Sequence, residues 1–152
     1  MSRPPPDPAR PAGAPRIVLG DWAALAAPAA AVREAVFVIE QGIPRELEWD
    51  AADADCVHAV ALDAAGRAVG TGRLLPDGHI GRMAVLREAR GQGVGGALLA
   101  RLLEAARRRG DARVVLGAQR SAEAFYRRHG FEPVGEPYDE VGIAHVRMQR
   151  AP

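Results

Sequence analysis

A glycine-rich segment between two regular patterns places the strongest limit on the fold of this chain. Four glycines fall within RGQGVGG, residues 90–96. The segment before them, 80–85, predicts a strand, and 93–109 carries apolar residues at helical spacing and predicts an amphipathic helix ending at Gly110. Backbone N–H groups at a helix start lack partners, and glycine lets an anion approach them closely. With the Arg90 cation, the segment predicts a site for a diphosphate.

Two other interpretations of the segment stay open at this point. The glycines can form a tight turn without binding a ligand. Gly91, Gly93 and Gly96 also match G-x-G-x-x-G, with Asp111 at the distance that a dinucleotide fold requires. In that fold, however, the turn follows its strand at once and the acid ends the next strand. Here a polar run follows Val85 and Asp111 precedes the next strand, so the dinucleotide interpretation is disfavoured.

The rest of the chain predicts one α/β domain over residues 16–152, after a proline-rich tail over 1–15 that has too little apolar surface to fold. The expected sheet is mixed and mostly antiparallel, with helices on both faces. Glycines 70, 72 and 81 indicate bulges. The expected strands are 17–19, 57–62, 68–75, 80–85, 114–116, 132–134 and 143–148. The other expected helices run from Pro28 to about Gln41 and, capped by Ser121, to about His129, and 42–55 is expected to be a surface loop.

The composition limits the function classes. The 152 residues suit one domain, and a net charge of +1 argues against general binding to nucleic acid or to a membrane surface. All 20 basic residues are arginine, which excludes a Walker-type phosphate loop and a Schiff-base lysine. One cysteine, Cys56, excludes an intrachain disulfide, and no apolar run of about 20 residues is evident. We expect a cytoplasmic protein without a membrane partner.

Two motifs carry a family resemblance. Arg90-x-x-Gly93-x-Gly95 after Met83-Ala84-Val85, and AEAFYRRHGF at 122–131, resemble the acyl-CoA-binding segments of the GNAT acyltransferase superfamily. The resemblance implies a GNAT-like fold with acetyl-CoA as cosubstrate, and a pantetheine arm lying between the strands at 80–85 and 114–118. Gln119 stands where the family often has asparagine, and Arg128 is a candidate for the 3′-phosphate. The implied cofactor-binding residues are Met83, Ala84, Val85, Arg90, Gly91, Gln92, Gly93, Val94, Gly95, Gln119, Phe125 and Arg128.

The same resemblance implies that Tyr126 is the general acid for the departing thiolate. Helical spacing alone favours a core aromatic with a satisfied hydroxyl, and the Phe-Tyr context reverses that preference. An amine acceptor must lose a proton before attack, because its pKa is ~10.4. The candidate bases are Glu40, Glu140 and His145, with His58 and His79 favoured as structural. Segments 36–44 and 138–148 resemble the ElaA-like branch of the superfamily.

The sequence therefore predicts an N-acetyltransferase that moves acetyl directly from acetyl-CoA to a primary amine of a small molecule or peptide. No metal site is expected, and a homodimer is left open. The alternative is a catalytically inactive acyl-CoA-binding sensor or interaction module of the same fold. The acidic loop can be ordinary solvated surface or can attract a cationic amine through its field; its acids are Glu46, Glu48, Asp50, Asp53 and Asp55.

Overall fold

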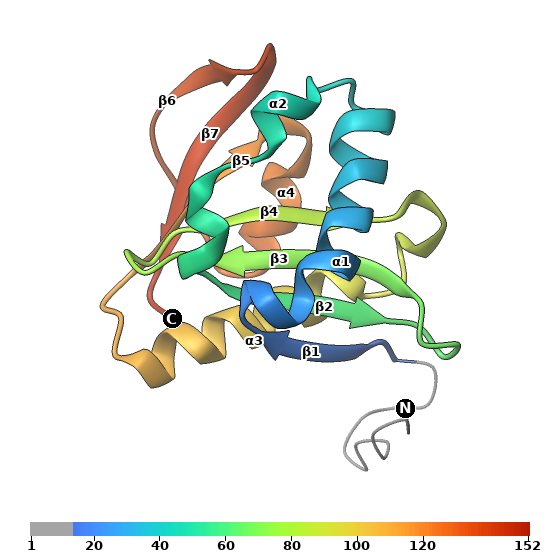
Figure 1. Cartoon of the computed structure of the whole chain (residues 1–152). Coiled ribbons are helices and arrows are strands. Elements are labelled where there is room, and N and C mark those ends of the chain that lie inside the picture. The colour runs from blue at the N-terminus through green and yellow to red at the C-terminus, as the bar shows by residue number, and fades with distance from the viewer. Residues whose placement is uncertain (1–13) are drawn as a thin grey trace.

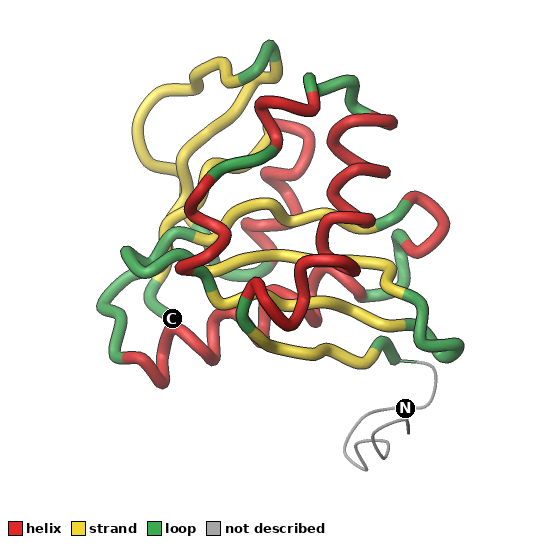
Figure 2. The backbone as a smooth tube through the Cα atoms, viewed as in Figure 1, coloured by secondary structure: helices red, strands yellow, loops and turns green. Residues whose placement is uncertain are grey.

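The computed structural model describes residues 14–152, so the predicted tail lies, except for its last two residues, outside the described part. Fifteen elements follow along the chain (Figures 1 and 2). The strands are β1 (Arg16–Gly20), β2 (Val57–Leu62), β3 (Ala68–Leu74), β4 (Ile80–Val85), β5 (Val114–Gln119), β6 (Glu132–Glu140) and β7 (Ile143–Arg150). The α-helices are α1 (Trp22–Arg33), α2 (Arg45–Glu48), α3 (Val94–Arg109) and α4 (Glu123–Arg128). A π-helical segment η1 (Glu34–Glu40) continues α1, and short 3₁₀ turns are η2 (Ala51–Asp55), η3 (Arg87–Ala89) and η4 (Arg120–Ala122).

The strands form two antiparallel sheets that meet at one point. The first has the order β1-β2-β3-β4 and the second β5-β7-β6. They are joined by a parallel bridge between His79 and Val115, where the Val115 N–H donates to the Gly78 carbonyl at 3.1 Å. Beyond this bridge β4 and β5 diverge. The predicted α/β fold with a mostly antiparallel sheet is confirmed, and the predicted divergence of these two strands is present.

Helices cover the first sheet on both faces (Figure 1). α1 and η1 lie on one side, where Val32 and Val36 enter the core, and α3 lies on the other. Three leucines of α3, Leu98, Leu99 and Leu102, are fully buried. Burying a leucine side chain stabilises a fold by roughly 1.5–3 kcal/mol, so this stripe holds α3 firmly against the sheet.

A bulge in β4 bends the strand beside the point of divergence. Thr71 pairs with Ala84 and Arg73 with Gly81, so Gly72 alone lies opposite both Arg82 and Met83. A Cβ on Gly72 would lie 2.3 Å from Sδ of Met83. Glycine at this position therefore allows the extra residue to fit, and Arg82 takes up a left-handed backbone with φ of 50°. The bulge indicated by the sequence is confirmed at Gly72.

The first helix begins earlier than predicted. Asp21 caps it, since its carboxylate accepts a hydrogen bond from the Ala24 N–H at 2.9 Å, and the helix starts at Trp22. Pro28 therefore lies inside the helix, and the prediction that it is the first helical residue is wrong. Proline favours the start of a helix, which is why Pro28 was expected there, but Asp21, seven residues earlier, provides the cap.

The helix that spans α1 and η1, Trp22–Glu40, has a mean hydropathy of 1.5 and is long and apolar enough to cross a membrane. Its inner side chains instead pack in the folded domain, where Leu25 and Ala29 contact Val60 of β2. A buried core helix passes the same length and hydropathy test. Of its most apolar stretch 33% is buried in the fold, so one face of this helix belongs to the protein core.

Two further segments differ from the expectation. The segment expected as a surface loop contains α2 and η2, because two of its acids are buried against arginines of neighbouring elements. β6 extends to Glu140 and forms a hairpin with β7, so most of the loop expected between the closing strands is strand. The cap predicted at Ser121 is absent: α4 begins at Glu123, and Ala122 at its N-cap position has no capping side chain.

Candidate active site

The divergence of β4 and β5 opens a cleft of about 810 Å³. Its floor and walls come from β4, β5, η1 and α4. One wall comes from α2 and the β6–β7 hairpin, and we call this the hairpin wall. It consists of Leu47, Glu48, Tyr138, Glu140, Val141 and His145. The cleft therefore joins the predicted cofactor strand β4 to the segments expected to meet the acceptor.

The glycine-rich loop presents a row of unpartnered amides beside this cleft. Within residues 14–152, the backbone N–H groups of Gly91, Gln92 and Gly93 donate no hydrogen bond. The next amides belong to the first turn of α3, where helical geometry leaves them without intrahelical acceptors. Gly91 and Gly93 have φ of 77° and 81°, with open space where a Cβ would be. Glycine is thus required there for its backbone conformation, and the loop fits an anionic diphosphate.

Arg90 is already paired on the cleft side of this loop. Its Nη1 and Nη2 donate to the two carboxylate oxygens of Glu40 at 2.8 and 2.7 Å, and Nε donates to the Val85 carbonyl at 3.0 Å. The hydrogen bonds from Arg90 lower the pKa of Glu40, and the same pair raises the pKa of Arg90. Two residues predicted for separate roles, cofactor cation and acceptor-side base, therefore meet in one ion pair.

A second bridge joins the end of the first helix to β5. The side-chain amides of Gln41 and Gln119 face each other: Nε2 of Gln119 donates to Oε1 of Gln41 at 2.9 Å, and the return contact is 3.4 Å. Both residues line the cleft. Glu40 and Gln41, neighbours in sequence, thus connect η1 to the loop at Arg90 and to the end of β5.

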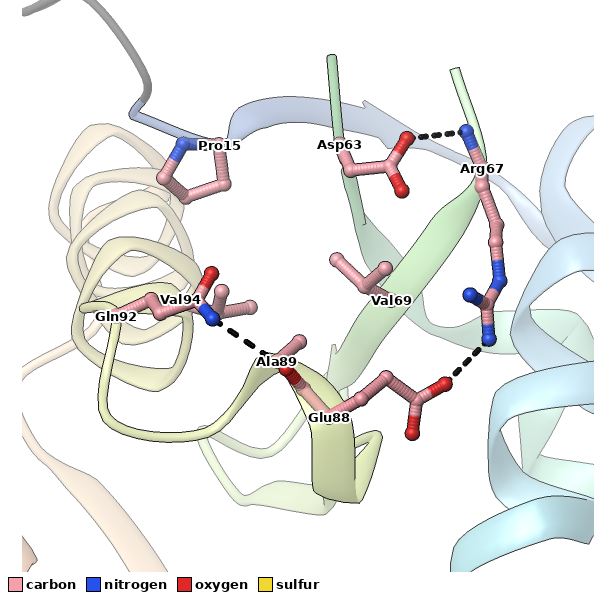
Figure 3. A pocket seen from close by; sticks show the side chains of 8 residues that line it. All are labelled: Pro15, Asp63, Arg67, Val69, Glu88, Ala89, Gln92 and Val94. Atoms are coloured by element: carbon pink, nitrogen blue, oxygen red, sulfur yellow. Dashed lines mark hydrogen bonds and ion pairs between the residues drawn. The ribbon is translucent and has the colours of Figure 1, made fainter. Parts of the chain in front are cut away.

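Four more predicted cofactor residues line the cleft, in addition to Arg90 and Gln119; the six that do not are Gly91, Gln92, Gly93, Val94, Gly95 and Arg128. Met83, Ala84, Val85 and Phe125 are in its wall. Gly95 lies against Phe125, since a Cβ there would be 3.2 Å from the ring. The side chains of Gln92 and Val94 instead face a separate cavity of about 130 Å³, together with Pro15 and an ion pair between Arg67 and Glu88 (Figure 3). Because the side chains of residues 92 and 94 face this other cavity, only their backbones are available to a ligand of the loop. Arg128 is exposed and lies outside the cleft.

Tyr126 lies in the cleft wall and is 7% exposed. Its ring packs edge-to-face against Phe125 and Phe131, with centroid distances of 5.0 and 5.8 Å. In the described residues no hydrogen bond reaches its hydroxyl. Burial raises the pKa of Tyr126 to about 12. The residue is therefore both a core aromatic and a protonated donor at the cleft surface.

His145 is held in the hairpin wall with one nitrogen free. Its Nδ1 lies 2.6 Å from the carbonyl oxygen of Ile143, and its ring stacks on Tyr138 at a centroid distance of 5.7 Å. A carbonyl only accepts, so Nδ1 carries the proton and the Nε2 of the neutral ring keeps a lone pair. The Glu140 carboxylate lies 3.7 Å from Nε2. Two predicted acceptor-side residues are thus brought together.

The acidic segment contributes a buried ionic network behind the hairpin wall. Arg33, 1% exposed, donates to the Glu48 carboxylate and to Asp53 at 2.9 and 3.2 Å, while Arg73 binds Asp50 through two contacts of 2.8 Å. The interpretation of this segment as solvated surface is therefore wrong for Glu48 and Asp53. Sequence reasoning missed the arginine partners of these acids. The arginines at positions 33, 73 and 82 lie far from one another in sequence, so no local pattern indicates that they share one acidic cluster.

The remaining histidines and the cysteine have structural surroundings. His58 is 1% exposed, with Nε2 at 2.9 Å from the Asp53 carbonyl, and burial lowers its pKa. His79 lines the cleft and carries the bridge to β5. Cys56 is buried, and burial raises its pKa. Over residues 14–152, no group of three or more histidine, cysteine or acidic side chains is arranged to hold a metal ion.

A diverging strand pair, a row of loop amides before a long helix and a tyrosine inside the cleft together define an acyl-CoA-dependent acyltransferase fold. The family model described as the acetyltransferase (GNAT) domain matches residues 26–151, and the chain belongs to this family. The superfamily resemblance seen in the sequence is thereby confirmed.

Similar proteins include members of the ElaA-like branch. The chain is 37% identical to the N-acetyltransferase YjcF of Bacillus subtilis over 78% of this chain and 87% of that protein, and 36% identical to ElaA of Escherichia coli over 78% and 82%. Among solved structures, an N-acetyltransferase from Lactobacillus plantarum has a TM-score of 0.83 at 34% identity, covering 91% of this chain and 98% of the other. Escherichia coli ElaA has a TM-score of 0.78 at 31% identity, covering 90% and 99%.

Proposed function

We propose that this protein transfers an acetyl group from acetyl-CoA directly to the primary amine of a small molecule or peptide. The observation that carries the proposal is the cleft itself, which is lined by a protonated tyrosine and by a histidine whose Nε2 makes no hydrogen bond, and which ends at Arg90, the residue directly before the unpartnered loop amides. Acetyl-CoA would supply the activated acyl thioester. The amides of residues 91–96 would hold its diphosphate, and β4 from Met83 to Val85 would hold the pantetheine arm.

His145 is the base in this proposal. Its Nδ1–H is fixed on the Ile143 carbonyl, so Nε2 is positioned to take a proton from the incoming ammonium group. Glu140, 3.7 Å away, stabilises the resulting imidazolium and attracts the cationic amine. Glu40 is disfavoured as the base, because the Arg90 guanidinium lowers its pKa and occupies both of its oxygens. Its role is to position Arg90.

Tyr126 acts in this proposal on the leaving group, the thiolate of CoA. With a pKa of about 12 it stays protonated at neutral pH, so its hydroxyl donates a hydrogen bond to the developing thiolate at the sulfur position. A phenol of this pKa is a weaker acid than a thiol of pKa ~8.5. Tyr126 therefore acts by stabilising the negative charge on the departing sulfur through its hydrogen bond and keeps its own proton, so that CoA leaves as the thiolate.

The test is a turnover assay that detects free thiol from acetyl-CoA with a panel of primary amines. We expect Tyr126→Phe to lower kcat by ~10²-fold or more while the affinity for CoA is retained, since only the donor is lost. Tyr138→Phe is the matched control, because it removes the other tyrosine hydroxyl of the same cleft, and we expect a smaller loss.

The competing function is an acyl-CoA-binding sensor with the same fold. It predicts CoA binding with no amine-dependent thiol release in the wild type, and the same result in Tyr126→Phe. That outcome would contradict the enzymatic proposal while leaving the fold assignment intact. We also propose a cytoplasmic location, which fractionation of expressing cells would test.

A further inference from the structure

Two strained residues point to the part of the cleft that selects the acceptor. Within residues 14–152, Arg82 and Val141 are the only non-glycine residues with positive φ, at 50° and 48°. A left-handed backbone costs roughly 1–2 kcal/mol per residue, and such strain clusters at functional sites. Arg82 is in β4 and Val141 is at the tip of the β6–β7 hairpin, yet both line the same cleft.

Arg82 is the less fully compensated arginine of the ionic network. Its Nη2 donates to Asp50 at 3.2 Å, but its Nε, although buried, has no hydrogen-bond partner and lies 3.8 Å from Glu48. No hydrogen bond in the described residues uses its Nη1. The Nε of Arg73 also lacks a partner, but Arg73 makes three contacts of 2.8 Å with Asp50 and Asp53, so its two terminal nitrogens are both used.

The pKa shifts of Arg82 and Arg73 agree with this difference in their hydrogen bonding. Burial, together with the nearby charge of Arg73, lowers the pKa of Arg82. The pKa of Arg73 is raised, because its two carboxylate partners outweigh its burial. The Arg82 side chain is also 31% exposed. It therefore presents to the cleft a guanidinium with unused hydrogen-bond donors, which the oxygen atoms of an added carboxylate would accept from.

We propose that Arg82 binds a carboxylate of the acceptor, so that the acceptor class is an amine that also carries a carboxylate. This inference rests on the proposed acetyl transfer. Glu48 and Asp50 lie beside Arg82 and Glu140 lies in the same cleft, and these three acids disfavour a dianionic phosphate more strongly than a singly charged carboxylate. A planar carboxylate also matches the guanidinium geometry.

Exposed apolar side chains in the hairpin wall favour an acceptor that also carries an apolar group. Leu47 is 53% exposed, Val141 45% and Tyr138 40%, and all three line the cleft. An apolar group on the acceptor would cover them, with a gain of roughly 25 cal/mol for each Å² removed from water. The favoured acceptor is therefore an apolar amino acid or a compound of that kind.

The test compares matched pairs of amines that differ only in the carboxylate, such as leucine against 3-methylbutylamine and phenylalanine against 2-phenylethylamine. Acetyl-CoA turnover gives kcat/KM for each, and calorimetry gives binding of each to the CoA-loaded protein. We expect the carboxylate-bearing member to be favoured by ~10-fold or more in the wild type, as for a charge-assisted hydrogen bond. In Arg82→Gln this ratio should fall toward one. Arg113→Gln, which removes an exposed arginine elsewhere, should keep it.

The outcomes separate the two proposals. Turnover of both members with equal kcat/KM would overturn the role of Arg82 while supporting acetyl transfer. No CoA binding and no turnover of any amine would overturn acetyl transfer and this inference with it. Arg82→Lys covers the case in which Arg82→Gln fails to fold: it keeps the charge but loses the planar fork, so we expect a reduced preference, and an unreduced one would contradict the proposal.

Discussion

At the scale of single residues, His145 carries the base chemistry of the proposed function. Replacing it with glutamine keeps a side chain of similar size that can hydrogen-bond but cannot take up the proton. We expect His145→Gln to lower kcat by ~10²–10⁴-fold, the usual contribution of a positioned general base. Steady-state kinetics measures this, with calorimetry to confirm that CoA still binds. A loss of less than about threefold would remove His145 from the mechanism and favour a water-mediated route.

Asp50 gives a prediction for stability against pH. Hydrogen bonds from Arg73 hold the pKa of Asp50 at about 2, below its unfolded value of ~3.9. A lowered pKa means that the stabilisation is fully present above about pH 4 and is lost as pH falls toward 2. Asp50→Asn should therefore unfold at lower urea than the wild type at pH 7, and the difference should shrink between pH 4 and 2. Asp55→Asn, an exposed control, should show no such pH-dependent difference.

The residues that sequence reasoning identified best are those with a local signature. Tyr126, in its Phe-Tyr context, lines the cleft, and the glycines of the loop lie directly before α3, because their spacing along one segment determines their placement. Arg82 and the pairing of Glu40 with Arg90 were not predicted. Their partners are 32 and 50 residues away in sequence, so only the folded chain brings them together.

At the scale of elements, the β6–β7 hairpin stores strain at its tip. Val141 and Gly142 form a two-residue turn with φ of 48° and 77°, a geometry that favours asparagine over a β-branched residue at the first position. Val141→Asn should therefore stabilise the protein by about 1 kcal/mol, raising Tm by about 2–4 °C. The same variant should lose part of its activity toward apolar acceptors.

Val134→Asn is the control for this prediction, since Val134 is another exposed valine of the same hairpin, within β6, and has no positive φ. Asparagine is unfavourable in a strand, so this change should not stabilise the protein. If Val141→Asn lowered Tm as well, the strain assigned to the hairpin tip would be contradicted. Calorimetric melting curves measure both variants.

Element boundaries were predicted where capping residues and periodicity agree. α3 lies between Gly93 and Gly110, both left-handed, as the sequence indicated. The start of α1 was predicted too late, because Pro28 was predicted as the first helical residue although Asp21 caps the helix. β6 was predicted too short because Pro133, Gly135 and Pro137 resemble loop residues; the strand is at a sheet edge, where proline costs no ladder hydrogen bond.

At the scale of the whole molecule, function follows from the separation of two sheets. A continuous sheet would pair β4 with β5 along their length and leave no room for a cofactor arm. The two sheets are instead joined only by the isolated bridge between His79 and Val115 within the described residues. The order of elements predicted the fold class, but the depth of the cleft depends on packing between η1, α4 and the hairpin, which the sequence does not encode locally.

The most direct test of the central claim is a calorimetric titration of the purified protein with CoA and acetyl-CoA, with NAD and ATP as comparison ligands. The structure predicts that both CoA species bind and NAD does not, and that Arg90→Gln weakens CoA binding by ~10-fold or more while Arg113→Gln retains wild-type affinity. Absence of CoA binding, or a preference for NAD, would contradict the assignment of the cleft to an acyl-CoA cosubstrate.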